Sequence, residues 1–259
     1  MAPRTARSLT LWTALAAAAF VYAAASSSDY VDARTGIPIR FEMTDDMFPP
    51  SWLGGEVRAT AVSVDKAEVD RSLQLADAGM ANYPAGLLKE NLEAVYFVKE
   101  MRFYGLKYGG TNSRGTVYIT NRGVRQGFTD LYILSTFHHE LSSILLRNHP
   151  EKFDSAAWHA ANREGFRYRS SGMESLKDGS ADTKYGHRFH IDGFLNQYAT
   201  SSMEEDFNPY AEALFMGDRR FWEIVDRFPR VEQKADVILA FYGALDPGYT
   251  EEHFRGLAQ

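Results

Sequence analysis

The 259-residue sequence contains no cysteine. Disulfide bonds, thiolate zinc sites and cysteine nucleophiles are therefore excluded. Positive charge is also scarce, because 28 Lys and Arg stand against 34 Asp and Glu and give a net charge of −6. This balance predicts no nucleic-acid partner. Hydrophobic residues make up 45% and charged residues 24% of the chain, which are the proportions of a globular protein.

Long apolar runs are also lacking, with one exception near the start of the chain. The segment from Leu9 to Ala25 is almost entirely apolar, follows Arg4 and Arg7, and ends in small alanines. This pattern is typical of a secretory signal peptide over residues 1–25, and it predicts an exported protein, periplasmic or extracellular. The alternative is an uncleaved membrane anchor, although a membrane span usually needs about 20 apolar residues. No membrane span is expected in the mature chain, from residue 26 onward.

Hydrophobic spacing predicts an α+β fold with a strand-rich first half and a helical second half. A single domain is expected over residues 26–259. Asp65 and Glu68 predict a capping box at the start of the first helix, and Gly79 predicts its end. Residues 165–193 have few apolar clusters and are predicted to be irregular. The expected strands are 37–43, 57–64, 94–104 and 115–120, and the expected helices are 65–78, 85–92, 129–149, 154–162, 202–215, 221–228, 231–242 and 250–257.

The helix predicted over 129–149 contains the dipeptide His139-Glu140. In H-E-x-x-H metallopeptidases, two histidines four residues apart bind zinc, and the glutamate accepts a proton from the metal-bound water. Here Ser143 occupies the position of the second histidine. A His-Glu dipeptide also arises readily by chance, so an ordinary helix with a polar end is the alternative.

A second candidate zinc ligand is Glu205, in the first turn of the helix predicted over 202–215. A glutamate on a downstream helix is a common further ligand of zinc sites. The alternative is a capping box, because Ser202 and Glu205 have the spacing of that motif. Both roles would draw on the same carboxylate.

Four segments of the chain, GTVYITNRG, TFHHELSSILLRN, GFLNQYATSSMEEDFNPYAEALF and FYGALDPGYTEEHFRGL, together resemble a family of bacterial zinc-binding metallopeptidases. These are zincin-like proteins, similar in pattern to lethal-factor-type catalytic domains. The resemblance covers about residues 109–257 and implies a zincin-like fold. It implies that His139 and Glu205 bind zinc and that Glu140 is the general base. It places Tyr198 where a tyrosine hydrogen-bonds the substrate carbonyl or the oxyanion.

The same resemblance makes the strand 115–120 an edge strand along which a peptide substrate lies extended. The second zinc ligand does not transfer, because a serine hydroxyl at Ser143 is a poor ligand for zinc. Three alternatives remain open. His138 could contribute, although adjacent helix residues point about 100° apart. His187 or His190 could approach from the irregular stretch, or the site could hold no metal or bind it weakly.

The leading prediction is an exported zinc metallopeptidase that hydrolyses a peptide or protein substrate. The alternative is a catalytically inactive protein of the same fold that binds a peptide or a glycan. A third is a structural exported protein, in which Glu205 would engage only Ser202 and backbone amides. The surroundings of Ser143 distinguish the enzyme from the binding protein. An imidazole beside His139 and Glu205 would favour the enzyme, whereas Ser143 facing the metal position without one would favour binding.

Overall fold

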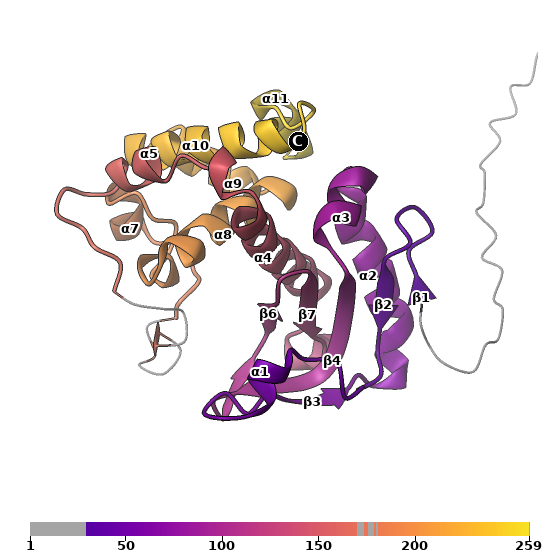
Figure 1. Ribbon diagram of the computed structural model, residues 1–259. Helices are drawn as coiled ribbons and strands as arrows, with labels where there is room; N and C mark the ends of the chain where they lie inside the picture. The colour runs from indigo at the N-terminus through magenta and orange to yellow at the C-terminus, as the bar shows by residue number, and fades with distance from the viewer. Residues whose placement is uncertain (1–29, 170–173, 176–178, 180, 259) are drawn as a thin grey trace, which may run out of the picture.

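The computed structural model describes residues 30–169, 174–175, 179 and 181–258, so the signal peptide predicted over 1–25 lies outside the described residues. A mixed sheet of seven strands occupies the first half of this part, and the second half is helical (Figure 1). The predicted α+β fold is therefore confirmed. None of the helices in the described ranges combines the length and the apolar character that crossing a bilayer requires.

The sheet is built around its longest strand, β4. This strand pairs in parallel with β2 and β7, and antiparallel with β3 and β5. The main order is β1-β2-β4-β7-β6, with β6 antiparallel to β7 at one end. The strands are β1 (Tyr30–Val31), β2 (Pro38–Arg40), β3 (Thr60–Ser63), β4 (Ala94–Phe103), β5 (Leu106–Tyr108), β6 (Gly110–Asn112) and β7 (Thr116–Thr120).

Both faces of the sheet are covered, since alternate residues of β4 are buried in two different hydrophobic clusters. Val95 and Phe97 belong to the main core, together with buried residues of the helices that pack on that face. Tyr96 and Val98 point to the other face, where they join a smaller cluster that includes Phe48. This alternation is the period of two expected of a strand buried on both sides.

Helix α4 lies between the sheet and the helices of the second half (Figure 1). It packs against β6 and β7 of the sheet, and against α8 on the other side. The site described below lies along this helix. The main α-helices are α1 (Pro50–Leu53), α2 (Val69–Ala81), α3 (Ala85–Asn91), α4 (Asp130–Asn148), α5 (Ser155–Ala160), α7 (His187–Ile191), α8 (Met203–Phe215), α9 (Arg219–Val225), α10 (Pro229–Leu245) and α11 (Glu251–Leu257).

Three local predictions are wrong. The Asp65 side chain caps no helix, because its carboxylate pairs with Lys99 at 2.8 Å. Gly79 does not end α2 but lies inside it, where a Cβ atom would stand 2.7 Å from Cδ1 of Phe137. The glycine therefore lets α2 approach α4 closely. The stretch predicted to be irregular contains the short helix α7.

Candidate functional site

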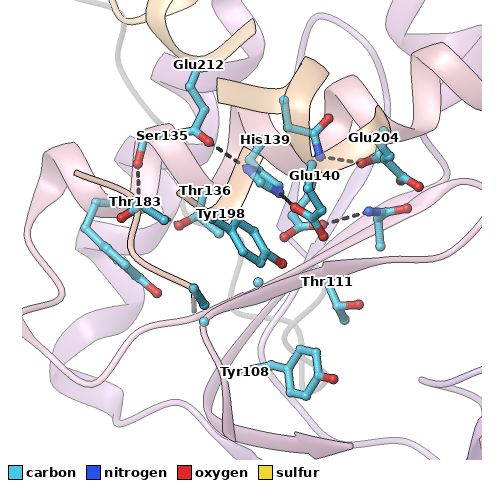
Figure 2. A pocket seen from close by; sticks show the side chains of 18 of the residues that line it. Tyr108, Thr111, Ser135, Thr136, His139, Glu140, Thr183, Tyr198, Glu204 and Glu212 are labelled. Carbon is cyan, nitrogen blue, oxygen red and sulfur yellow. Dashed lines mark hydrogen bonds and ion pairs between the residues drawn. The ribbon is translucent and has the colours of Figure 1, made fainter. Parts of the chain in front are cut away.

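One face of α4 is polar and borders a pocket of about 500 Å³ (Figure 2). The helix begins after its N-cap residue Thr129, whose hydroxyl accepts a hydrogen bond from the Tyr132 amide at 3.2 Å. Polar side chains then recur three or four residues apart, so they lie along one side of the helix. Strand β6 forms a second wall of the pocket, and α8 forms a third. The polar residues that α4 contributes are Ser135, Thr136, His139, Glu140, Ser143 and Arg147.

The edge strand beside this pocket is β6, not the predicted strand 115–120. That strand is β7, which lies between β4 and β6 and is buried at all five positions. Strand β6 stands at the end of the strand order and is only half-buried. The prediction failed because residues 109–112 contain two glycines and no apolar alternation, and therefore resemble a loop.

The hydrogen bonds of β6 leave some backbone groups pointing away from β7. The Gly109 carbonyl accepts from the Thr120 amide, and the Ser113 amide donates to the Thr116 carbonyl. Because ladder bonds in an antiparallel pair use alternate residues, the amide and carbonyl groups of Gly110 and Asn112 face outward. A second extended chain could pair with these groups at the sheet edge.

Gly110 also sets how closely β6 approaches α4. A Cβ atom on this residue would lie 2.4 Å from Oε1 of Glu140 and 2.4 Å from Cγ2 of Thr136. Only glycine fits at this distance without a shift of the neighbouring atoms. The strand backbone and the Glu140 carboxyl group are therefore in direct contact.

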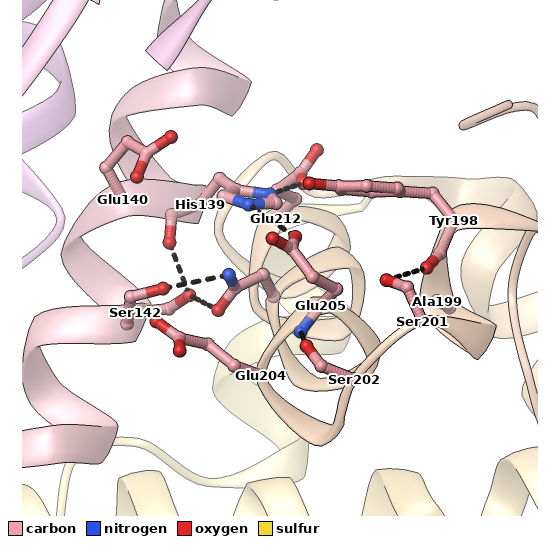
Figure 3. Close-up of polar contacts among 12 residues, drawn as sticks. His139, Glu140, Ser142, Tyr198, Ala199, Ser201, Ser202, Glu204, Glu205 and Glu212 are labelled. Carbon is pink, nitrogen blue, oxygen red and sulfur yellow. Dashed lines mark hydrogen bonds and ion pairs between the residues drawn. The ribbon is translucent and has the colours of Figure 1, made fainter. Parts of the chain in front are cut away.

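His139 lies between two carboxylates of α8 (Figure 3). Its Nδ1 is 2.6 Å from Oε1 of Glu212. Its Nε2 is 3.3 Å from Oε2 of Glu205, a long contact that leaves this buried oxygen without a well-formed hydrogen bond. Burial alone would lower the pKa of His139, but the hydrogen bonds to Glu205 and Glu212 outweigh burial and raise that pKa well above its usual value. In its protonated form the ring donates towards both carboxylates.

Glu140 lies on the β6 side of His139. The residue is 7% exposed, and its Oε2 accepts a hydrogen bond from the Asn112 amide group at 2.7 Å. Burial raises the pKa of Glu140 to about 7, against the lowering effect of His139. Arg147 completes this wall, because its guanidinium group donates to Oδ1 of Asn112 at 2.7 Å and lies 3.4 Å from Glu204.

Tyr198 reaches the same pocket from the segment before α8 (Figure 2). Burial and the negative charge of Glu205, to which its hydroxyl is hydrogen-bonded, raise the pKa of Tyr198. The hydroxyl therefore stays protonated and can donate. The Ser202 hydroxyl accepts a hydrogen bond from the Glu205 backbone amide at 3.1 Å, so one half of the predicted capping box forms. The Glu205 carboxylate, however, faces His139 and not the helix end.

Ser143 lines the pocket but is already engaged. Its hydroxyl accepts a hydrogen bond from the Asn208 amide group at 2.9 Å. The Asn208 carbonyl oxygen accepts from the Ser142 hydroxyl at 2.7 Å. All three residues are almost fully buried. One asparagine of α8 thus joins two serines of α4, at the position where the resemblance implies a second histidine.

The three histidines considered as replacement ligands do not lie at His139. His138 is buried on another side of α4, where its Nδ1 is 2.9 Å from the Tyr83 hydroxyl and its ring stacks on Phe215. His187 packs its ring against Phe228. His190 packs there too, and its Nε2 is 3.1 Å from the Leu195 carbonyl oxygen.

The side chains of the described residues do not form a complete zinc site. Catalytic zinc ions usually have three protein ligands. Over the described ranges, no group of three or more His, Asp or Glu residues is placed to hold a metal ion. His139 and Glu205 supply two suitable groups, and Ser143 offers only a neutral hydroxyl that Asn208 occupies. Among the described residues, the predicted site therefore offers two of the three side chains that a catalytic zinc ion usually needs, and the binding of zinc stays a prediction.

Several residues of the pocket were not predicted from the sequence. On α8, Glu205, Asn208 and Glu212 are three and four residues apart, so a single helix face presents all three. That spacing was visible in the sequence and could have identified Asn208 and Glu212. No sequence pattern pointed to Asn112, because its role depends on the position of β6.

Comparisons with known proteins add no assignment, since no family model, no curated protein and no solved structure matches the chain.

Proposed function

We propose that this chain is a zincin-like peptide-binding protein whose pocket acts without catalysis. The observation that carries the proposal is the hydrogen bond between Ser143 and Asn208, within a pocket that holds one imidazole, that of His139. An asparagine already satisfies the serine that replaces the second zinc ligand. The carboxylates of Glu205 and Glu212 hold His139 in place directly. These side-chain contacts therefore join α4 to α8 without a metal ion.

The occupant best suited to the pocket is an extended peptide. The outward amides and carbonyls of Gly110 and Asn112 can pair with a strand, as in other cases of strand addition to a sheet edge. The Tyr198 hydroxyl and the Glu140 carboxyl group add polar contacts across the pocket. A glycan would not use the backbone groups of β6 in this regular way, which favours the peptide.

A zinc metallopeptidase is the second candidate function, and one observation favours it. The 3.3 Å between Nε2 of His139 and Oε2 of Glu205 is close to the separation of two ligands at about 2.0–2.1 Å on a tetrahedral zinc ion. Glu212 on Nδ1 also resembles the carboxylate that orients a metal-binding histidine. Against this candidate stands the lack of a third protein ligand in the described part of the chain.

Zinc content and peptide binding together test the proposal. The chain from Ser26 would be purified without a histidine tag, and its zinc measured by elemental mass spectrometry in the wild type, Glu205→Ala and Ser143→His. A library of blocked hexapeptides would then be tested for binding by fluorescence anisotropy and for cleavage by mass spectrometry. Glu140→Gln is the matched control, because it removes a general base while keeping the shape of the side chain.

We expect no stoichiometric zinc in the wild type, peptide binding with or without added zinc, and no cleavage by either the wild type or Glu140→Gln. Stoichiometric zinc that disappears in Glu205→Ala, with cleavage that Glu140→Gln abolishes, would overturn the proposal in favour of the metallopeptidase. No binding by any peptide would overturn it as well.

A further inference from the structure

A second, smaller cavity of about 180 Å³ adjoins the main pocket, and His139 and Glu212 line both. In the view of Figure 2, Ser135 and Thr183 lie on one side of His139, whereas Glu140 lies on the other. Ser135 and Thr183 also line both cavities. Sites for whole small molecules usually measure about 300–1,000 Å³, so this cavity suits a single side chain.

The lining of the smaller cavity combines an apolar wall, neutral polar side chains, His139 and two carboxylates. Pro209, Ala213 and Met216 line it on the α8 side. The carboxylates of Glu212 and Asp218 also line it. A side chain with a long aliphatic stem and a cationic end matches this distribution, because the stem can pack on the apolar wall while the cation meets the acids.

Asp218 is fixed in place and carries no paired cation in the described structure. Its Oδ1 accepts from the Arg220 amide at 2.8 Å at the start of α9, and its Oδ2 accepts from the Tyr185 hydroxyl at 2.9 Å. Both contacts use neutral donors. The exposed Arg220 guanidinium group lies 5.6 Å from the centre of the Tyr185 ring and is the nearby competing cation. The two ring nitrogens of His139 already face Glu205 and Glu212.

We propose that the smaller cavity, which we call the side-chain pocket, binds a lysine or arginine side chain of a peptide that lies along β6. This inference rests on the proposed peptide-binding function. It adds a specificity that the edge strand alone does not provide, since backbone pairing does not distinguish one side chain from another. Asp218 is the residue that would determine this specificity, because Glu212 already pairs with His139.

The test compares lysine, arginine and norleucine at each position of a blocked hexapeptide, because norleucine keeps an aliphatic stem without the charge. We expect one position at which the cationic peptides bind the wild type about tenfold more tightly, which corresponds to about 1.4 kcal/mol. In Asp218→Asn this preference should fall below about threefold, while binding of the norleucine peptide stays unchanged. The asparagine oxygen can still cap α9, and its NH2 group can donate to the Tyr185 hydroxyl, so the fold should be kept.

A second measurement locates the bound side chain. In a protein with methyl-labelled methionine, the NMR signal of Met216 should shift on titration with the best lysine peptide, whereas that of Met80, buried in the main core, should not. Arg220→Ala should strengthen the cationic preference. Peptide binding without a cationic preference at any position, or a preference unchanged in Asp218→Asn, would overturn the side-chain pocket alone. No peptide binding at all would overturn both this inference and the proposed function.

Discussion

Replacing Lys234 with methionine tests how the helix that carries Glu205 is anchored. Lys234 of α10 pairs with Asp206 of α8, and both side chains are 0% exposed. The same carboxylate oxygen accepts from the Trp158 indole at 3.0 Å and from the Tyr168 hydroxyl at 2.6 Å. The ammonium group also lies 4.0 Å from the centre of the Phe194 ring. The pair therefore joins α10 and α8 to α5 and to the segments that contain Tyr168 and Phe194.

The magnitude follows from the complete burial of both groups. Removing one partner of a buried ion pair leaves an uncompensated charge and destabilises a protein by about 3–5 kcal/mol. We therefore expect Lys234→Met to lower the free energy of unfolding by this amount, out of a typical total of about 5–15 kcal/mol. For a domain of this size the melting temperature should fall by roughly 6–20 °C.

Urea denaturation followed by circular dichroism measures the effect, and a double variant controls it. Asp206→Asn combined with Lys234→Met removes both charges but keeps an oxygen that accepts from Trp158 and Tyr168. The double variant should regain at least about 2 kcal/mol relative to Lys234→Met, because no buried charge is left unpaired. A loss below about 1 kcal/mol in Lys234→Met, or no recovery in the double variant, would refute the reasoning.

Three further predictions concern the helix α4 and its neighbours. Burial lowers the pKa of His138 from 6.5 to about 3, so below pH 6.5 the unfolded chain binds a proton at this residue and the folded chain does not. From pH 6 to pH 5 the free energy of unfolding of the wild type should therefore fall by about 1 kcal/mol more than that of His138→Gln. Equal losses in the two proteins would contradict this prediction. Gly110→Ala should weaken peptide binding at least tenfold, because the added Cβ atom pushes β6 away from α4. The control Gly86→Ala adds a Cβ atom that meets no other atom within 4 Å, so it should leave binding unchanged and raise the melting temperature slightly. Equal binding by both variants would argue against the close contact between β6 and α4. Asn208→Ala should cost about 1–3 kcal/mol in urea unfolding, because two buried serine hydroxyls lose a partner; a neutral result would mean that water replaces the amide.

Much of the fold was accessible from the sequence, since the periodicity of long apolar segments is a strong signal. The helix predicted over 129–149 is α4, and the strand predicted over 94–104 is β4. The predictions failed at positions where tertiary contacts determine the local structure. Gly79 suggested a helix end but serves the packing of Phe137. Aspartate is a common N-cap residue, but the Asp65 carboxylate forms an ion pair with Lys99 instead.

The candidate site was predicted in part. The sequence pointed to His139, Glu140, Tyr198 and Glu205, and the structure brings all four to one pocket. It could not show that Asn208 engages Ser143, because residues 65 positions apart meet only through the packing of α4 on α8. The edge strand was misplaced for a related reason. Strand order in a sheet depends on pairing between segments, and the composition of β6 carries little strand signal.

The alternation of backbone groups along β6 has a consequence for how a partner would be recognised. A chain that pairs with Gly110 and Asn112 turns every second side chain towards α4 and the others away. Selection would then act on alternate residues, and those between them would be free to vary. Natural partners would share a spaced pattern and not a contiguous motif. A comparison of bound peptides should therefore align alternate positions first, because a search for identical consecutive residues would miss the relationship.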